Sequence, residues 1–264
     1  MNTLTTVALH HQVLGQGEPV LILHGFMGSA DNWRTLGLRM ASQSQVWLVD
    51  QRNHGHSPHT DAWDYPHMAA DVLRLMDEHR LDRVSLIGHS MGGKTAMQLA
   101  AHHPDRVEKL VVVDISTRQS TGGHEAILNA LQQADITHTS KRHEVEALLK
   151  AGIPNEAERQ FILKALYRDG DHFAWRFNLP VFVRQYPAVL AGMDGNPVYP
   201  HPTRFIKGGA SRYIQAEDWP EIQRLFPQAQ LEVIAGAGHW VHAQAPAEFL
   251  AVLNRFLNKT YSLS

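Results

Sequence analysis

Six short apolar runs, separated by segments with helical spacing, constrain the fold of this chain more than any other feature. They are Val20–Gly25, Gln45–Asp50, Arg83–Gly88, Lys109–Ile115, Arg204–Gly209 and Leu231–Gly236. Most of the runs lack an alternation of apolar and polar residues, which is typical of parallel strands covered on both faces. The pattern therefore predicts an α/β fold built on a mostly parallel, doubly wound sheet.

Three of the intervening segments carry apolar residues at helical spacing. They are Pro66–Arg80, Met91 to about His102, and Pro246–Asn258. Pro66 suits the first turn of a helix, because the N–H that it lacks has no partner there in any case. The residues near Thr6–Leu14 are predicted to add a short antiparallel strand to the sheet.

One long interval, from about Thr117 to Met193, interrupts the alternation. It holds no convincing strand, only the helical patterns Glu125–Gln133, Lys141–Lys150 and Glu156–Tyr167, followed by the aromatic-rich stretch His172–Pro187. We interpret residues 117–193 as a helical cap inserted between the fourth and fifth runs, with residues 1–116 and 194–264 as the core. The alternative is that the interval supplies two further outer helices of the sheet.

The octapeptide GHSMGGKT, Gly88–Thr95, fits two different active sites. As G-x-S-x-G it predicts a nucleophile elbow, a sharp strand-to-helix turn that exposes the hydroxyl of Ser90. As G-x-x-x-x-G-K-T it predicts a phosphate-binding loop, in which Lys94 contacts the phosphates and Thr95 holds Mg²⁺. Both sites need a strand before the octapeptide and a helix after it, so the octapeptide alone does not decide between them.

Composition limits the classes of function that remain. The 264 residues carry a formal net charge of −2, so no basic field exists to attract nucleic acid. The chain has no cysteine, which excludes disulfides, thiolate metal sites and cysteine nucleophiles. No apolar run is long enough to span a membrane, and MNTLTTVALHHQV is not a secretory signal, so we expect a cytoplasmic protein. The pairs His54–His56 and His102–His103 lack a further ligand at suitable spacing, so neither a metal nor another cofactor is expected.

Motifs elsewhere in the chain favour the elbow. A nucleophilic serine needs a base, an acid that orients the base, and N–H donors for the oxyanion. The glycine-flanked His239 in AGAGHWVH follows the last run, which places a histidine after the serine and the acid in chain order. The turn HGFMGS, His24–Ser29, could aim the Phe26 N–H at the same point as the Met91 N–H. A phosphate-binding loop would leave both motifs without a role.

These motifs together resemble those of a known family. DQRNHGHS (Asp50–Ser57) fits the loop pattern D-x-R-x-x-G-x-S. With GHSMGGK, VVVDIS, WRFNLPV and IAGAGHWVHA, it resembles the α/β-hydrolases, and among them the YbfF-like esterases of bacteria. The resemblance covers nearly the whole chain. It implies an α/β-hydrolase fold with an inserted cap, and a serine hydrolase with Ser90 as nucleophile and His239 as base.

The acid of the triad is harder to assign from the sequence than the serine and the histidine. Most α/β-hydrolases carry it in the turn after the strand that follows the cap, but here that turn, Lys207–Ile214, has Ala210 or Ser211 at the expected position. The resemblance to YbfF-like esterases implies that Asp114, at the end of an earlier strand, takes the role. From there it could reach Nδ1 of His239 from the other side.

Two other carboxylates, Glu217 and Asp218, are weaker candidates for the acid because they lie several residues beyond the turn. Ser211 is predicted to support the acid or the imidazole through a hydrogen bond.

We therefore expect a serine carboxylesterase that acts on a small-molecule ester with a short-to-medium acyl group. Trp240, Trp175, Phe177 and Tyr186 are candidates for lining the substrate pocket, although aromatic residues of a cap also pack in cores. The same triad would serve a thioesterase or a hydrolase of carbon–carbon bonds. A hydrolase fold used as a ligand receptor with little turnover is an alternative of another class. The sequence does not predict the oligomeric state.

Overall fold

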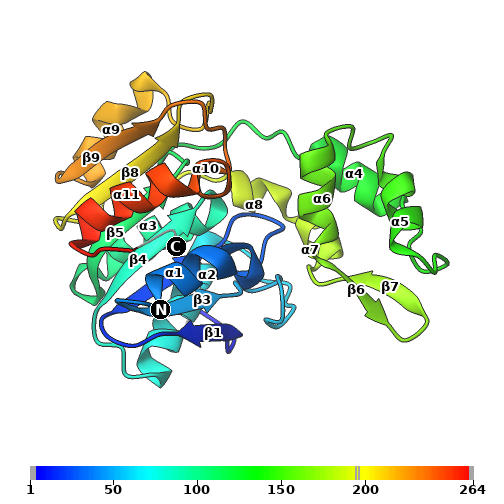
Figure 1. Cartoon of the computed structure of the whole chain (residues 1–264), viewed down its shortest axis with the longest axis horizontal. Coiled ribbons are helices and arrows are strands. Elements are labelled where there is room, and N and C mark those ends of the chain that lie inside the picture. The colour runs from blue at the N-terminus through cyan, green and yellow to red at the C-terminus, as the bar shows by residue number, and fades with distance from the viewer. Residues whose placement is uncertain (1–3, 194, 196, 262–264) are drawn as a thin grey trace.

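A seven-stranded sheet forms the centre of the computed structural model, which describes residues 4–193, 195 and 197–261 (Figure 1). The strands, in spatial order, are β1 (His11–Leu14), β3 (Gln45–Val49), β2 (Pro19–Leu23), β4 (Val84–His89), β5 (Val107–Val113), β8 (Thr203–Gly208) and β9 (Ala229–Ile234). β1 pairs with β3 in antiparallel fashion, and all other neighbours in this sheet are parallel. The six predicted strands and the antiparallel addition are therefore confirmed.

Burial explains why the apolar runs show no alternation. The central strands β2, β4 and β5 are buried along most of their length, so both faces of each need apolar side chains. The strand at the edge, β9, is half-exposed instead, and Val233 is one of its exposed residues. Apolar runs of this kind thus mark the middle of the sheet.

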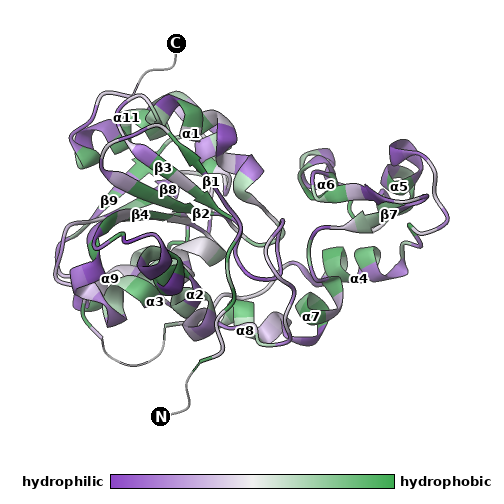
Figure 2. Cartoon of the chain, turned by 90° about the horizontal axis from the view of Figure 1, so that it is seen from below, coloured by the Kyte–Doolittle hydropathy of each residue, from purple (hydrophilic) through white to green (hydrophobic). Residues whose placement is uncertain are grey.

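Helices cover both faces of the sheet (Figure 2). One face carries α1 (Arg34–Met40), α10 (Val241–Gln244) and α11 (Pro246–Leu257), and the other carries α2 (Tyr65–Glu78), α3 (Met91–His102) and α9 (Trp219–Leu225). Three 3₁₀ turns complete this part, η1 (Ala30–Trp33), η2 (Pro104–Arg106) and η3 (Ala216–Asp218). α2 begins as its sequence predicts, because Asp64 accepts a hydrogen bond of 2.8 Å from the His67 N–H and Pro66 lies in the first turn.

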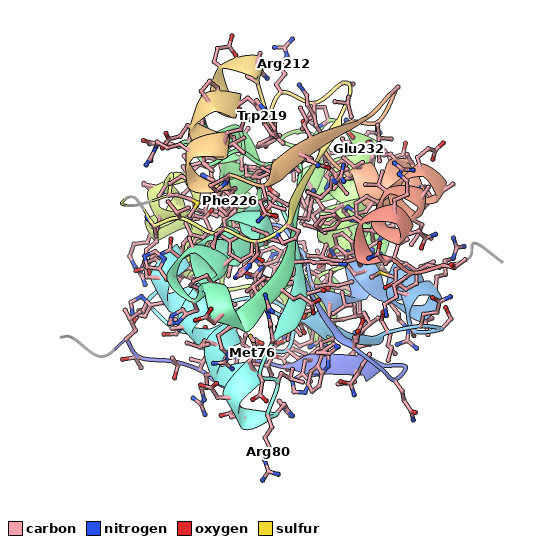
Figure 3. The ribbon with its side chains drawn as sticks, turned by 90° about the vertical axis from the view of Figure 1, so that its left-hand side faces the viewer. Met76, Arg80, Arg212, Trp219, Phe226 and Glu232 are labelled. Carbon is pink, nitrogen blue, oxygen red and sulfur yellow. The ribbon has the colours of Figure 1, made fainter. Side chains whose placement is uncertain are left out.

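Two hydrophobic clusters hold the helices to the sheet. Met76 of α2 and Phe226, just after α9, belong to the cluster on one face. Phe249 of α11 belongs to the cluster on the other face. Figure 3 shows the sheet with helices on both sides, and Arg80 projects into solvent one turn after the buried Met76.

Residues 117–193, here called the inserted segment, lie between β5 and β8. They form α4 (Glu125–Gln133), α5 (Arg142–Leu149), α6 (Glu156–Leu163), β6 (Leu166–Asp169), β7 (His172–Trp175), α7 (Leu179–Arg184) and α8 (Tyr186–Leu190). Figure 1 shows the segment beside the sheet rather than on either of its faces. It has a hydrophobic cluster of its own, which Phe26, Met68 and Met91 of the main body join.

The expectation that the inserted segment contains helices alone is wrong. β6 and β7 form an antiparallel hairpin, and the helix predicted to run to Tyr167 ends at Leu163. Two residues, Gly170 and Asp171, connect the strands, and Gly170 adopts the positive φ of 60° that tight hairpin turns require. A glycine-containing pair between two short runs that each contain an aromatic residue was the signal for this hairpin.

No helix in the described parts of the chain is both long enough and apolar enough to cross a membrane.

Candidate active site

Ser90 lies at a sharp turn between β4 and α3 and has the strained backbone of a nucleophile elbow. Its φ is 53° and its ψ is −119°, a conformation that residues other than glycine rarely adopt. The flanking glycines make the turn possible, since a Cβ at Gly88 would collide with the backbone of Gly92, and one at Gly92 with the backbone of Leu23. The sequence G-x-S-x-G thus follows from the close approach of three backbone segments.

His239 and Asp114 meet beside this turn from different strand ends. Asp114 follows β5 and is fully buried, and His239 lies in the loop after β9. Nδ1 of His239 lies 2.7 Å from Oδ2 of Asp114. Oδ1 of the same carboxylate accepts a hydrogen bond of 3.0 Å from the Gly208 N–H, and Oδ2 accepts one from the Ser211 hydroxyl. The structure therefore brings the predicted acid, base and supporting serine together, whereas Asp218 instead pairs with Arg118 at 2.6 Å.

The two predicted oxyanion donors lie next to Ser90. Phe26, Ser90 and Met91 line one cavity, and no hydrogen bond among the described residues uses the N–H of Phe26 or of Met91. The turn that contains Phe26 is stabilised by a hydrogen bond of 3.2 Å from the Met27 N–H to Nε2 of His54. Both backbone N–H groups are thus free to stabilise a negative oxygen at Ser90.

Histidines brace the backbone around the site. Nδ1 of His24 contacts the Gly25 carbonyl at 2.8 Å, and Nε2 of His89 contacts the carbonyl of His239 at 2.9 Å. Nδ1 of His54 lies 2.9 Å from the Arg52 carbonyl, so this neutral ring donates on one side and accepts from Met27 on the other. Each contact fixes a turn that carries a predicted site residue.

Buried histidines are expected to make the folded protein sensitive to acid. Burial lowers the pKa values of His24, His54, His89 and His242, that of His242 to about 3. The histidines of the unfolded chain take up protons near pH 6.5, whereas these buried histidines of the folded chain do not. Their contribution to the free energy of unfolding is therefore complete above that pH and is lost as the pH falls below it. His242, whose pKa is lowered to about 3, should remove about 2 kcal/mol from the free energy of unfolding between about pH 7 and pH 5, and the other three histidines act in the same direction.

Urea denaturation at the two pH values, with His242→Phe as the matched variant, measures this loss. A phenyl ring keeps the stack on Trp33, whose ring centroid lies 4.0 Å away, and removes a buried Nδ1 that has no hydrogen-bond partner. The variant should therefore lose about 2 kcal/mol less than the wild type between the two pH values. Equal losses would show that His242 does not contribute.

Two small cavities meet at Ser90, with volumes of about 50 Å³ and 20 Å³. The larger also holds His239, and its remaining lining residues are Gly25, Phe26, Met27, His89, His124, Ile127, Glu158, Phe161, Ile162 and Trp240. The smaller is walled by residues that include Val189 and Leu190 of α8. Trp240 therefore lies where the sequence predicts a pocket residue.

The other three predicted pocket residues do not line these cavities. The rings of Trp175 and Phe177 stack on each other at 5.2 Å, and both pack in the cluster of the inserted segment. Tyr186 is buried in the same cluster, and its hydroxyl contacts His124 rather than the cavity. Trp175 ends β7, Phe177 lies between β7 and α7, and Tyr186 begins α8, and all three side chains pack into this cluster.

Sequence reasoning missed the residues that take their place. Glu158, Phe161 and Ile162 lie on one face of α6, and their spacing of three and four residues was the available signal. Tyr213 stacks on the ring of His239, and the ring centroids are 3.9 Å apart. No pattern in the sequence indicated this contact.

If the octapeptide is an elbow, its sequence predicts that Lys94 and Thr95 are ordinary residues of the following helix, with the lysine solvated; this expectation is wrong. Lys94 is 1% exposed, and its Nζ donates to the carbonyls of Leu190 at 3.2 Å and of Ala191. The hydroxyl of Thr95 donates to the Met91 carbonyl at 3.2 Å. Both side chains are thus engaged with the protein, so the phosphate-loop alternative does not fit the structure.

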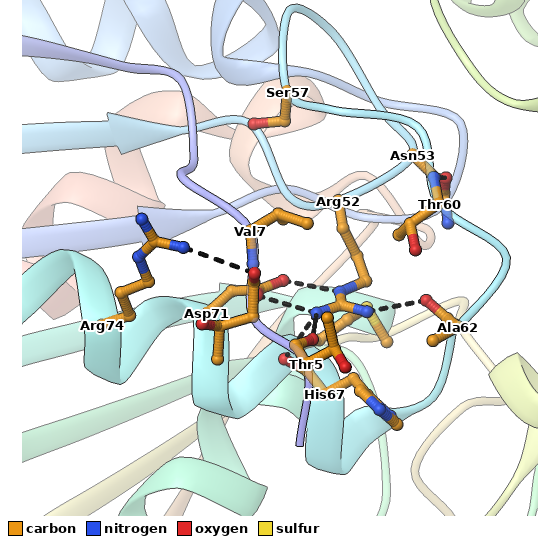
Figure 4. Close-up of polar contacts among 12 residues, drawn as sticks. Thr5, Val7, Arg52, Asn53, Ser57, Thr60, Ala62, His67, Asp71 and Arg74 are labelled. Atoms are coloured by element: carbon orange, nitrogen blue, oxygen red, sulfur yellow. Dashed lines mark hydrogen bonds and ion pairs between the residues drawn. The ribbon is translucent and has the colours of Figure 1, made fainter. Parts of the chain in front are cut away.

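The loop that follows β3 stabilises the structure around the site, and its charged side chains bind other parts of the protein. Arg52 donates two hydrogen bonds to Asp71 of α2, at 2.6 and 2.8 Å, and both side chains are buried (Figure 4). Asp50 accepts a hydrogen bond of 2.7 Å from the Ala30 N–H.

In the described part of the chain, no three histidine or acidic side chains come together as a metal site.

The fold and the site define the class of this protein. A mostly parallel sheet with a strained serine after β4, an acid after β5 and a histidine after β9 is the architecture of an α/β-hydrolase. A family model described as "alpha/beta hydrolase fold" matches residues 18–149. The chain belongs to the α/β-hydrolase family.

Similar proteins specify the class further. Esterase YbfF of Escherichia coli strain K12 is 38% identical over 242 residues, which cover 91% of this chain and 93% of the relative. The sn-1-specific diacylglycerol lipase ABHD11 of Xenopus laevis is 39% identical over 249 residues, 91% of this chain and 80% of that protein. A solved structure described as a marine microorganism esterase superposes with a TM-score of 0.93 at 39% identity, covering 95% of this chain and 100% of the other. The chain is an α/β-hydrolase of the esterase and lipase type, and the resemblance to YbfF-like esterases is confirmed.

Proposed function

We propose that this chain is a serine carboxylesterase that hydrolyses short-to-medium acyl esters through an acyl-enzyme. The observation that carries the proposal is the 2.7 Å contact between His239 Nδ1 and the buried carboxylate of Asp114, beside a strained Ser90 that shares a cavity with His239. An imidazole oriented in this way holds its proton on Nδ1 and keeps Nε2 free to accept one.

The reaction then follows two steps. Ser90 Oγ attacks the ester carbonyl while His239 takes its proton, and the N–H groups of Phe26 and Met91 stabilise the oxyanion. His239 protonates the leaving alcohol, and Asp114 stabilises the imidazolium that forms in between. A water molecule activated by the same imidazole releases the acyl group and restores the free serine.

The walls of the cavities support a neutral, short acyl group. Phe161, Ile162 and Trp240 supply apolar surface to the larger cavity beside its polar lining residues. Glu158 is the only carboxylate in that lining and disfavours an anionic acyl chain. The inserted segment provides α6 and α8 for these walls, and we infer that it serves as a cap that limits the length of the acyl chain.

A fluorophosphonate probe and a series of p-nitrophenyl esters test the proposal. The probe should label wild-type protein at Ser90, and kcat/KM should be highest for short-to-medium acyl chains and fall for long ones. Labelling at another residue, or no adduct at all, would overturn the proposal. A profile that rises towards long chains would instead favour a lipase of diacylglycerol type, and turnover of matched thioesters alone would favour a thioesterase.

A further inference from the structure

Lys94 is a buried lysine whose partners are backbone carbonyls. It lies in the first turn of α3, four residues after Ser90, and its backbone N–H donates to the Ser90 carbonyl at 3.1 Å. No carboxylate pairs with its ammonium in the described part of the chain, and burial, with Arg118 nearby, lowers its pKa to about 8. Burying a lysine ammonium without a carboxylate partner costs free energy, so the groups that its Nζ binds bear on its role.

The carbonyls that it binds belong to the point where the chain leaves the inserted segment. Leu190 is the last residue of α8 and Ala191 follows it, so their carbonyls have no partner within the helix. The preceding carbonyl, of Val189, accepts a hydrogen bond of 2.5 Å from the hydroxyl of Tyr65 in α2. Three consecutive carbonyls are thus held by side chains of two helices of the main body.

Near these carbonyls, the stretch of chain that enters the inserted segment is hydrogen-bonded to the stretch that leaves it. The Ser120 N–H donates to the Leu190 carbonyl at 2.8 Å, and the Met193 N–H donates to the Thr117 carbonyl at 2.9 Å. Gly192 lies so close to this incoming connection that a Cβ there would come within 2.9 Å of the Gln119 nitrogen. Lys94 therefore binds a joint between the segment and the sheet rather than a free loop.

The joint is also part of the cavity at the nucleophile. Val189 and Leu190 line the smaller cavity together with Ser90 and Met91. Because that cavity measures about 20 Å³, a small movement of this wall changes what fits beside Ser90.

We propose that Lys94 is a positioning residue that fixes the joint of the inserted segment against the nucleophile helix and thereby sets acyl-chain selectivity. The inference rests on the proposed esterase function. Lys94 touches neither substrate nor the reacting atoms; it holds the wall formed by Val189 and Leu190 at a fixed distance from Ser90. Tyr65 acts on the adjacent carbonyl in the same way.

Lys94→Met tests the proposal, because methionine keeps much of the length and apolar volume of the stem and removes the donors. We expect KM for the preferred p-nitrophenyl ester to rise about tenfold and the preference between butanoate and dodecanoate to flatten by a similar factor. kcat on the acetate should stay within about threefold of wild type, and fluorophosphonate should still label Ser90. Tyr65→Phe should shift selectivity in the same direction by less.

Lys109→Met is the matched control. Lys109 also donates to a backbone carbonyl, that of Phe256 at 3.2 Å, but it lies outside the cavities at Ser90. Its replacement should leave the chain-length profile unchanged.

Restoring the amine completes the test. The chain has no cysteine, so Lys94→Cys introduces a unique thiol. Alkylation with 2-bromoethylamine under denaturing conditions, followed by refolding, rebuilds a side chain with the length and amine of lysine, and S-methylation does not. The aminoethylated protein should recover wild-type selectivity and the methylated one should not.

An unchanged profile in Lys94→Met, or recovery in both alkylated forms, would overturn the proposal. So would an equal loss of kcat for every ester together with slower labelling of Ser90, because Lys94 would then serve the nucleophile or the fold. If Lys94→Met does not fold, Tyr65→Phe and the two alkylated proteins decide. Absence of labelling in wild-type protein would refute the esterase function itself, which is a different outcome.

Discussion

Replacing Ser90 by alanine should lower kcat for p-nitrophenyl butanoate by about 10⁶-fold while leaving the fold intact. The hydroxyl is the proposed nucleophile, and without it the remaining groups can only bind the ester and stabilise charge. None of the hydrogen bonds among the described residues uses Ser90 Oγ, so its removal breaks no hydrogen bond. A residual rate above that of water is expected from the N–H groups of Phe26 and Met91.

Comparison with Ser90→Gly separates chemistry from backbone strain. Both variants lack the hydroxyl and should be equally inactive, but only glycine adopts the φ of 53° without cost. Relief of the strain should make Ser90→Gly about 1 kcal/mol more stable than Ser90→Ala in urea denaturation. Substantial turnover by either variant, measured against a preparation free of contaminating esterase, would show that Ser90 is not the nucleophile.

The elbow could be predicted from the sequence because its causes are local. Gly88 and Gly92 are fixed by backbone contacts within a few residues of Ser90 and with the neighbouring strand. The sheet could be predicted for a similar reason, since burial on both faces leaves a continuous apolar run in each central strand. The meeting of Asp114 with His239, 125 residues apart, followed from chain order and the resemblance to a family rather than from any local signal.

Features that depend on distant packing could not be predicted. The spacing of apolar residues on a helix indicates that one face is buried but not what that face contacts, so the spacing in α6 did not place Phe161 and Ile162 at the cavity. The same limit applies to Lys94, whose partners lie 96 and 97 residues away. A lysine in a helix is usually solvated, and only the end of α8 makes this one different.

Asp114→Asn should lower kcat by about 10⁴-fold with little change in the fold. The carboxylate of Asp114 faces three donors, the N–H of Gly208, the hydroxyl of Ser211 and Nδ1 of His239. An amide has only one oxygen to offer, and with that oxygen towards Gly208 its NH₂ group points at His239. The imidazole would then carry its proton on Nε2, where it cannot accept the proton of Ser90.

Ser211→Ala and Asp218→Asn show whether this loss belongs to the acid. Ser211→Ala removes one donor from a charged acceptor and should cost about tenfold in kcat, with a shift in the pH profile. Asp218 pairs with Arg118 away from the cavities at Ser90, so its replacement should leave kcat unchanged. A loss below about 100-fold in Asp114→Asn would remove Asp114 from the triad, since an orienting carboxylate contributes far more. If Ser211→Ala changes neither activity nor its pH profile, the supporting role of Ser211 is wrong, and the Gly208 N–H alone assists His239 in holding the acid.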